Sequence, residues 1–426
     1  MKKQENNTLI IITRHYPYSV VSESFLDAEI PYLCSVFKKI VIIPTKVAPS
    51  IEKTDRKLPD NVIIDNSFLQ STSFGNIRNN KIRKMSRILI VIKSRQFYGE
   101  IVKNIPVIFH RSAIKCLIKH LSNALKFEKW IKKYINNNNL DLSTTIFYTY
   151  WLIGVSSGMA FTKMHYPEIK LISRAHAWDL YQERYELDYI PFRKEIFRYL
   201  NKLFVISEYG KQYLIKRYPT SESIYTVAKL GVEDPKFSAK SSNDGILRIV
   251  SCSYVSPIKR IDLIIRGLAE FSQLRPTVRI KWVHLGYGPL LPKIKDFSKE
   301  YLPKNIEFSS PGFLQSVMQF YKNNPVDIFI NTSASEGIPV SIMEAQSCAI
   351  PVIATSVGGT PEIVSNTVGV LLDENPTPLE IASAICTILD EPEQFKQKKL
   401  NSKKNWDANY NAERNFSSFA EQLKKL

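Results

Sequence analysis

Short apolar runs alternate with longer amphipathic stretches along most of this chain, and this alternation restricts the folds that it can adopt. Runs such as Thr8–Thr13 (TLIIIT) and Val326–Ile330 (VDIFI) have the length of buried strands, and helical patterns follow them. Strands that alternate with helices predict parallel sheets with helices on both faces. We therefore expect an α/β protein with doubly wound sheets. The other strands predicted are Lys39–Pro44, Ile146–Tyr150, Ile169–Arg174, Leu203–Ile206, Ile246–Cys252, Arg279–Leu285 and Pro351–Thr355.

A polar segment at residues 233–245 (EDPKFSAKSSNDG) divides this series in two. Its Ser, Asp, Lys, Pro and Gly content is typical of a linker. A chain of 426 residues that is 44% hydrophobic can bury a core on each side of it. We predict an N-terminal domain over residues 1–235, a C-terminal domain over residues 236–403, and a final helix at residues 404–426.

The cysteines and the apolar runs indicate a cellular compartment. The five cysteines lie far apart and form no C-x-x-C pair, so a disulfide framework and a zinc site are not expected. The apolar run Leu9–Ile12 is far too short for a signal peptide, and no run approaches the roughly 18 apolar residues of a membrane span. We expect a cytoplasmic protein that is soluble or peripheral on a membrane surface.

Most of the positive charge lies in one segment, residues 76–135. It holds 15 Lys and Arg against two Glu, which gives it +13 of the net charge of +18. Apolar residues are interleaved with the basic ones, a pattern that favours binding to anionic lipid headgroups. A solvated helical face and a nucleic-acid site are the alternatives. Since the sequence has no zinc finger, helix-turn-helix or RNP-like string, no nucleic-acid partner is expected.

The segment Asn331–Cys348 (NTSASEGIPVSIMEAQSC) predicts an anion site. It reads as a strand end, a tight loop and a helix N-terminus, and the backbone N–H groups of such a turn suit a phosphate. Glu336 and Glu344 flank the turn in the pattern E-x7-E, and carboxylates accept hydrogen bonds from paired hydroxyls. These features suggest a sugar nucleotide, with Glu336 on the sugar and Glu344 on the ribose.

Two further loops carry polar side chains directly after predicted strands, where α/β sheets bind their ligands. One contains His176, for which a structural histidine bonded to a backbone carbonyl is the alternative; a metal site with Asp179 lacks further ligands. The other contains Lys259 and Arg260 near a helix start. Two cations there oppose the helix dipole, unless they neutralise a bound diphosphate. An exposed surface pair is the alternative interpretation.

Glycines mark two more loops of the second domain. Gly286 and Gly288 form a G-x-G without the third glycine of a dinucleotide fingerprint, so we read it as a loop with a close backbone approach. Gly358 and Gly359 precede a Thr-Pro pair that opens a helix, with Thr360 as the expected N-cap. This second loop is a further candidate for the phosphate side of the site. No P-loop string occurs in the sequence.

Taken together and in this order, these motifs resemble those of the GT-B retaining glycosyltransferases of family 4. The strings that carry the resemblance are SEGIPVSIMEA, SPIKRID, HLGYGPL, IATSVGGTPEIV, ISRAHAWDLY and, at the domain junction, KLGVE. It covers the whole second domain, and in the first domain residues 148–233 and the opening βα unit. It implies two Rossmann-like domains that face each other across a cleft, with the donor bound mainly by the second domain and the final helix packed on the first.

The resemblance also implies roles for individual residues. Glu336 matches the position that contacts the donor sugar, Lys259 the lysine on the diphosphate, and His176 the histidine near the reacting carbon. The residues implied to bind the donor are Arg260, Gly286, Gly288, Gly312, Gly337, Ile338, Pro339, Glu344, Gly358 and Gly359. The sequence departs from the family in two places. The arginine that usually precedes the lysine is absent, which makes Arg260 the candidate for that charge, and Tyr18–Phe25 is not the usual glycine-rich acceptor loop.

The predicted function is therefore a glycosyltransferase that acts with retention of configuration in cell-surface polysaccharide biosynthesis. Its donor is a nucleoside-diphosphate sugar, its acceptor a saccharide, lipid-linked in this interpretation, and no cofactor or metal is required. Segment 76–135 is predicted to hold it on the inner face of the cell membrane. Two alternatives stay open: a GT-B-like sugar-nucleotide epimerase, and a non-catalytic nucleotide-sugar-binding subunit.

Overall fold

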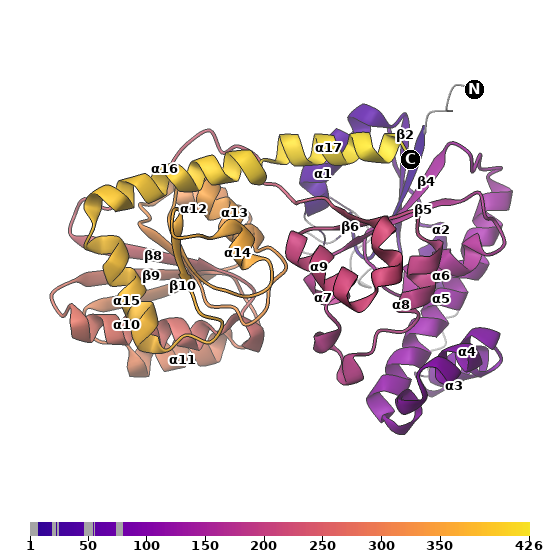
Figure 1. Cartoon of the computed structure of the whole chain (residues 1–426), viewed down its shortest axis with the longest axis horizontal. Coiled ribbons are helices and arrows are strands. Elements are labelled where there is room, and N and C mark those ends of the chain that lie inside the picture. Colours follow the sequence, from indigo (N-terminus) through magenta and orange to yellow (C-terminus); the bar gives the residue numbers. More distant parts are fainter. Residues whose placement is uncertain (1–6, 19–22, 24, 47–53, 55, 74–79) are drawn as a thin grey trace. The chain divides into compact units, whose positions relative to one another are not determined.

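The computed structural model describes residues 7–18, 23, 25–46, 54, 56–73 and 80–426, and these form two compact units. The first unit runs to Ile206 and also includes Gly210–Ala228 and Phe416–Leu426. The second comprises Ser207–Tyr209 and Lys229–Asn415. Each unit contains one parallel sheet with helices on both sides (Figure 1). The prediction of an α/β protein with two doubly wound sheets is thus confirmed.

The sheet of the first unit has seven strands in the order β3-β2-β1-β4-β5-β6-β7. All neighbouring strands are parallel. The chain moves outward from β1 to β3 and then returns to β4 beside β1, so the sheet has a switch point between β1 and β4, where ligands of such sheets bind. The strands are β1 Thr8–Thr13, β2 Lys39–Pro44, β3 Val62–Ile64, β4 Thr145–Thr149, β5 Lys170–Ala175, β6 Lys202–Val205 and β7 Tyr225–Val227.

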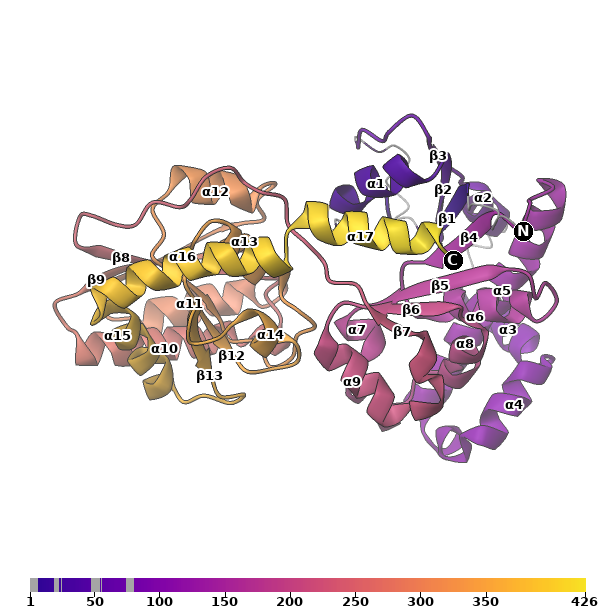
Figure 2. The same ribbon diagram turned by 45° about the horizontal axis from the view of Figure 1, so that its top comes forward.

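Both faces of this sheet are covered, because alternate residues of its strands belong to different clusters. In β1, Ile10 and Ile12 pack with α5 and α6, whereas Leu9 and Ile11 pack with α1 and α17. Figures 1 and 2 show α1 on one side of the sheet and α5, α6 and α8 on the other. The helices are α1 Phe25–Val36, α2 Ser67–Ser73, α3 Asn80–Ile92, α4 Arg95–Lys103, α5 Arg111–Asn137, α6 Gly154–Lys163, α7 Ala177–Leu180, α8 Arg193–Tyr199, α9 Glu208–Arg217 and α17 Ala412–Lys424, with short 3-10 turns η1 Ile105–Phe109, η2 Gln182–Arg184, η3 Glu186–Asp188 and η4 Pro219–Ile224.

The sheet of the second unit has six parallel strands in the order β10-β9-β8-β11-β12-β13, with a switch point between β8 and β11. The strands are β8 Ile246–Cys252, β9 Arg279–Leu285, β10 Ile306–Gly312, β11 Ile328–Asn331, β12 Val352–Thr355 and β13 Gly369–Leu372. The helices are η5 Pro257–Lys259, α10 Ile261–Leu274, α11 Leu291–Tyr301, α12 Val317–Asn323, α13 Val340–Ser347, α14 Thr360–Ile363, α15 Pro378–Leu389 and α16 Pro392–Asn409.

A buried ion pair ties the two helices on one face of the first sheet to its strands. Arg174 in β5 pairs with Glu29 in α1, and both side chains are fully buried. Tyr148 donates to the Glu29 carboxylate at 3.2 Å, and Arg174 also donates to the carbonyl of Ala228 at 3.0 Å. The guanidinium lies 4.5 Å from the ring centroid of Phe419 in α17. The end of the chain is thereby held in the first unit.

The structure differs from the sequence prediction mainly in short elements. The strands β3, β7, β10 and β13 were not predicted; β10 is irregular, and the other three have three or four residues. The predicted strand Val326–Ile330 begins two residues later, because the Asp327 carboxylate accepts hydrogen bonds from the backbone of Ser242 and Arg248. The final helical region contains two helices, α16 and α17, with Tyr410 and Asn411 between them.

Breaking the buried ion pair should destabilise the first unit. Glu29→Ala leaves the Arg174 guanidinium without its carboxylate in the core, which costs about 3–5 kcal/mol. Asp390→Ala removes a carboxylate from an exposed pair with Arg275 and should cost less than about 1 kcal/mol. Denaturant unfolding of both variants measures the difference. Equal unfolding midpoints for the two variants would contradict this account.

Candidate functional site

Lys259 and Glu336 meet at the switch point of the second sheet. Lys259 follows β8 and Glu336 follows β11, and these strands are neighbours although the two residues are 77 positions apart. The Lys259 Nζ lies 2.6 Å from the Glu336 Oε1, and the two side chains are 22% and 11% exposed. A partly exposed ion pair at this edge of the sheet can exchange its partners for a ligand.

Hydrogen bonds between the two loops fix this pair. The Thr332 hydroxyl donates to the carbonyl oxygens of Lys259 and Arg260, at 3.2 and 2.9 Å. The backbone N–H of Ala334 donates to the carbonyl of Ile258 at 2.8 Å. These hydrogen bonds hold the backbone on both sides of the Lys259–Glu336 pair.

The side chain of Arg260 makes different contacts from that of its neighbour Lys259. The backbone of Arg260 is left-handed (φ 46°), and its guanidinium donates to four protein acceptors. These are the carbonyl oxygens of Thr332, Ser333 and Glu374 and the Oδ1 of Asn375, at 2.7–2.9 Å. The Arg260 side chain therefore braces the loops after β11 and β13, whereas the Lys259 ammonium pairs with Glu336.

The loop Gly337-Ile338-Pro339 leads from Glu336 into α13. The first N–H groups of a helix lack partners within it, and this end carries the positive pole of the helix dipole. The loop is supported from behind by the glycines after β12: Gly359 donates to the Gly337 carbonyl at 2.7 Å, and a Cβ on Gly358 would lie 1.9 Å from the Glu336 carbonyl oxygen. Gly358 and Gly359 thus permit backbone packing behind the loop.

Glu344 lies one turn further along α13. Burial raises the pKa of its carboxyl to about 7, so a large fraction is protonated near neutral pH. The Tyr321 hydroxyl near it is buried and has no hydrogen-bond partner among the described residues. Burial also raises the pKa of the Cys252 thiol, and the Glu344 carboxylate adds to this effect. Glu344 is therefore a hydrogen-bond acceptor whose charge depends on the groups that contact its carboxyl.

The glycines after β9 and β10 join three loops by their backbones. A Cβ on Gly286 would lie 1.9 Å from the Ser253 carbonyl oxygen, and one on Gly288 would lie 2.4 Å from that of Val255. Gly286 also donates to the Gly312 carbonyl at 2.9 Å. Gly312 has room for a side chain but a left-handed backbone (φ 84°). The sequence predicted a close backbone approach at Gly286 and Gly288. In the structure, the groups that come close to them are carbonyl groups of other loops of the protein.

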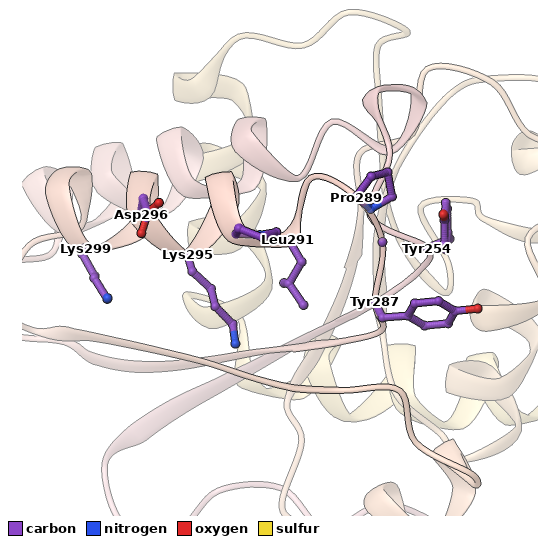
Figure 3. Close-up of a pocket in the computed structure, with 9 residues that line it drawn as sticks. Tyr254, Tyr287, Pro289, Leu291, Lys295, Asp296 and Lys299 are labelled. Carbon is purple, nitrogen blue, oxygen red and sulfur yellow. The ribbon is translucent and has the colours of Figure 1, made fainter.

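Aromatic side chains that the sequence analysis did not assign to the site stand on the same loops. The rings of Tyr254 and Tyr287 are 5.3 Å apart, and those of Tyr287 and Phe313 are 5.8 Å apart. A pocket of about 710 Å³ lies between the two tyrosines and α11 (Figure 3). Figure 3 shows Lys295 and Lys299 pointing the same way from α11. Exposed ring faces beside cations can hold a planar or sugar-like group.

In the first unit, His176 follows β5. It is buried, and neither ring nitrogen has a hydrogen-bond partner among the described residues. The ring packs against Tyr150 and Trp151, with centroids 4.9 and 4.5 Å apart. Its backbone N–H donates to the Asp179 carboxylate at 2.6 Å. Ring packing and the bond to Asp179 therefore fix His176 at the carboxyl end of β5, the edge where ligands of such sheets bind.

Glu23 organises the surroundings of His176 and was not singled out from the sequence. Its carboxylate accepts hydrogen bonds from the backbone N–H groups of Arg14, His15 and Tyr16 at 2.6–2.7 Å. It also accepts one from the Trp151 indole at 2.6 Å. A single glutamate gives no sequence signal, because three of its partners are backbone N–H groups after β1 and the fourth, Trp151, follows a different strand, β4. Its effect is to hold Trp151, and thereby His176, beside the loop after β1.

A metal centre has no counterpart in the part of the chain that the structure describes. There, no three His, Cys, Asp or Glu side chains are grouped so that they could hold a metal ion. His176 and Asp179 come near each other, with 4.0 Å between Nδ1 and Oδ2. Over the same residues, no helix has the length and apolar content needed to span a bilayer.

Comparisons with known proteins find a family match within the second unit. Residues 233–405 match the family model for glycosyl transferases group 1. The putative colanic acid biosynthesis glycosyltransferase WcaL of Escherichia coli K12 is 26% identical over 215 residues, which cover 48% of this chain and 52% of that protein. The O-antigen biosynthesis glycosyltransferase WbnH of Escherichia coli is 35% identical over 88 residues, 21% of this chain and 25% of that protein. The chain thus spans about half the length of WcaL and less of WbnH.

Solved structures resemble the whole chain. The lipopolysaccharide outer core galactosyltransferase WaaB has a TM-score of 0.66 at 14% identity, with 98% of this chain and 100% of that one covered. HepE of Anabaena, solved in complex with UDP-glucose, has a TM-score of 0.62 at 14% identity and the same coverage. These likenesses show the GT-B fold.

The partly buried carboxyl of Glu344 should make stability depend on pH. The unfolded chain ionises this group near pH 4.5, whereas the folded protein keeps it protonated until about pH 7. The folded state binds the extra proton, so stability falls as pH rises through this window, by on the order of 1–2 kcal/mol for a partly exposed group. Glu344→Gln should remove this fall, which melting curves from pH 4 to 8 will detect.

The matched control for this prediction is Glu393→Gln on α16, where the carboxylate is exposed. It should keep the pH dependence of the wild type. If Glu344→Gln shows the same pH dependence as the wild type, the assignment of a proton to Glu344 is wrong.

Proposed function

We propose that this chain, whose residues 233–405 match the family model for glycosyl transferases group 1, transfers a sugar from a nucleoside-diphosphate donor to a saccharide acceptor in polysaccharide biosynthesis. The observation that carries the proposal is the Lys259–Glu336 pair beside the N-terminus of α13. The pair offers an ammonium for a diphosphate and a carboxylate for sugar hydroxyls, next to backbone N–H groups that suit phosphate oxygens. The family match, WcaL and WbnH support the same activity.

Donor binding replaces the internal ion pair with two contacts to the ligand. The Lys259 ammonium moves to the diphosphate, where negative charge develops as the sugar leaves, and the fixed cation stabilises that charge. The Glu336 carboxylate accepts hydrogen bonds from the donor sugar, beside the loop Gly337-Ile338-Pro339. Glu344 accepts from the ribose hydroxyls, and this contact favours its ionised form.

The other predicted features complete the proposal. His176 of the first unit acts on the donor sugar, which supplies the hydrogen-bond partners that its ring lacks. Transfer proceeds with retention of anomeric configuration, as in the family 4 enzymes that the motifs resemble. Lys259 and the α13 N-terminus supply the positive charge at the diphosphate, and no metal is required. Arg260, whose four acceptors are protein atoms, positions Lys259 by bracing its loop.

The acceptor is a lipid-linked saccharide at the inner face of the cell membrane. The basic segment 76–135 brings the enzyme to it by binding anionic headgroups. Side chains of Arg87, Lys93 and Arg95 are exposed within this segment. The side chains of Lys81, Arg83 and Lys84, which belong to the same segment, lie outside the described ones.

Removing either member of the ion pair should abolish transfer without unfolding the protein. Lys259→Ala and Glu336→Gln should each lower the transfer rate by about 10²–10³-fold, because each removes a charge that acts on the transition state. The matched control is the exposed pair Lys396–Glu393, which has the same chemistry at 2.8 Å on the surface of α16. Lys396→Ala and Glu393→Gln should retain full activity. Product formation from donor and acceptor is measured after melting curves confirm folding.

Full activity in both Lys259→Ala and Glu336→Gln would contradict the assignment. The donor itself is identified by thermal shifts with UDP, GDP, ADP and their sugars, because a ligand that binds the folded state raises the melting temperature. Incubation of the donor without acceptor separates the alternatives. An epimerase would yield a new sugar nucleotide, whereas the proposed transferase yields only slow hydrolysis.

Binding to membranes should depend on salt and on charge. We expect co-sedimentation with anionic vesicles that weakens as salt rises, since screening shortens the reach of surface charges. Arg87→Gln, Lys93→Gln and Arg95→Gln together should weaken binding further, by about 1 kcal/mol per charge. The control neutralises Lys281, Lys322 and Lys396 of the second unit. Equal pelleting of the two triple variants would rule out segment 76–135 as the binding site.

A further inference from the structure

Large apolar side chains are exposed along α4 and η1. Val102 is 73% exposed and Phe109 is 77% exposed, and Tyr98, Ile105 and Ile108 are also open. Tyr98 and Val102 are four residues apart and therefore share one face of α4. Ile105, Ile108 and Phe109 follow in η1. We call these five residues the apolar stripe. Figure 1 shows α4 at the periphery of the first unit, away from its strands.

The opposite side of α4 is anchored, so the exposure of the stripe belongs to the fold. Glu100 is buried and accepts hydrogen bonds from the Tyr189 hydroxyl at 2.9 Å and the Phe192 backbone at 3.1 Å. Val107 of η1 is buried in a cluster with Leu117 of α5. Buried groups on one side and open apolar groups on the other are typical of a helix that docks onto something outside the chain.

A second exposed apolar row lies on the preceding helix. In α3, Met85, Leu89 and Ile92 are exposed at spacings of four and three residues. Val91 of the same helix is buried in the cluster that also holds Val107. Both helices therefore bury groups on one side and present large apolar side chains on another.

The charges around the stripe identify its partner. From residue 80 to 127 the sequence has one acidic residue, Glu100, and that carboxylate is buried. The exposed basic side chains there include Arg95, Arg111 and Lys115. Two acidic residues of neighbouring elements contact basic groups beside the stripe. Glu195 pairs with Lys103, and Glu186 lies 3.6 Å from His110. Apolar side chains among unpaired cations match a bilayer with anionic headgroups, whereas two copies of this basic face would repel each other.

We propose that the apolar stripe inserts into the boundary between headgroups and acyl chains of an anionic bilayer, while the basic side chains beside it bind the headgroups. The inference deepens the membrane association of the proposed function and rests on it. Electrostatic adsorption of the basic segment to anionic headgroups would be sufficient for that membrane association. Insertion adds a contribution that salt does not screen, because it comes from burial of apolar surface.

The first test removes apolar surface at constant charge. Ile105→Ser with Phe109→Ser should lower affinity for vesicles of phosphatidylglycerol and phosphatidylcholine by at least about tenfold, and should abolish the binding that remains in 0.5 M NaCl. The control is Leu379→Ser with Leu400→Ser, two exposed leucines of the second unit, which should bind like the wild type. Transfer to a water-soluble acceptor should stay unchanged in both double variants.

The second test measures directly how deeply the apolar stripe enters the bilayer. Phe109→Trp adds an indole at the tip of the stripe, and its emission, taken as the difference from the wild type, should shift to the blue on vesicles and be quenched by lipids brominated on the acyl chains. Equal affinity of the serine variant and the wild type, or no quenching of the new indole, overturns insertion. If the charge variants still weaken pelleting, adsorption stands and insertion alone fails. A wild-type dimer that the serine variant loses would instead assign the stripe to a second copy.

Discussion

The site of the second unit depends on an ion pair between two loops that meet at the switch point of a parallel sheet. Lys259 and Glu336 approach to 2.6 Å because β8 and β11 are neighbours. Thr332 and Ala334 then bond the loops to each other, and Arg260 bonds them to the loop after β13. The backbone is thus preorganised and the two charges satisfy each other until a ligand separates them. This arrangement keeps a partly buried carboxylate and ammonium from being left uncompensated in the free protein.

The adjacent basic residues Lys259 and Arg260 have different roles in this arrangement. Arg260 uses its planar fork of donors to hold four acceptors in fixed positions, a task that suits a guanidinium. Lys259 carries a compact charge on a flexible chain, which can turn from Glu336 to a phosphate. The first unit follows a similar logic: Glu23 holds Trp151, and Trp151 packs against an imidazole that has no partner among the described residues.

Local patterns in the sequence predicted most of the strands and the loops that carry chemistry. Strand β8 and the turn before α13 are examples, because apolar runs and helix-start signals are local. The sequence does not show which atoms these side chains reach. The acceptors of Arg260 lie 72–115 positions away, and the carbonyl groups behind Gly286 and Gly358 belong to other loops. Similarly, the apolar stripe is exposed because α4 buries the side that carries Glu100. Helix periodicity alone does not show which side of a helix is buried.

The central claim is that Lys259 leaves Glu336 to bind a diphosphate. It is tested most directly by titrating wild type and Lys259→Ala with the matched nucleoside diphosphate and monophosphate, for the base that the thermal shifts identify. The account predicts that the wild type binds the diphosphate more tightly, and that Lys259→Ala loses this preference while it retains affinity for the monophosphate. A Lys259→Ala variant that still discriminates between the two nucleotides as the wild type does would contradict it.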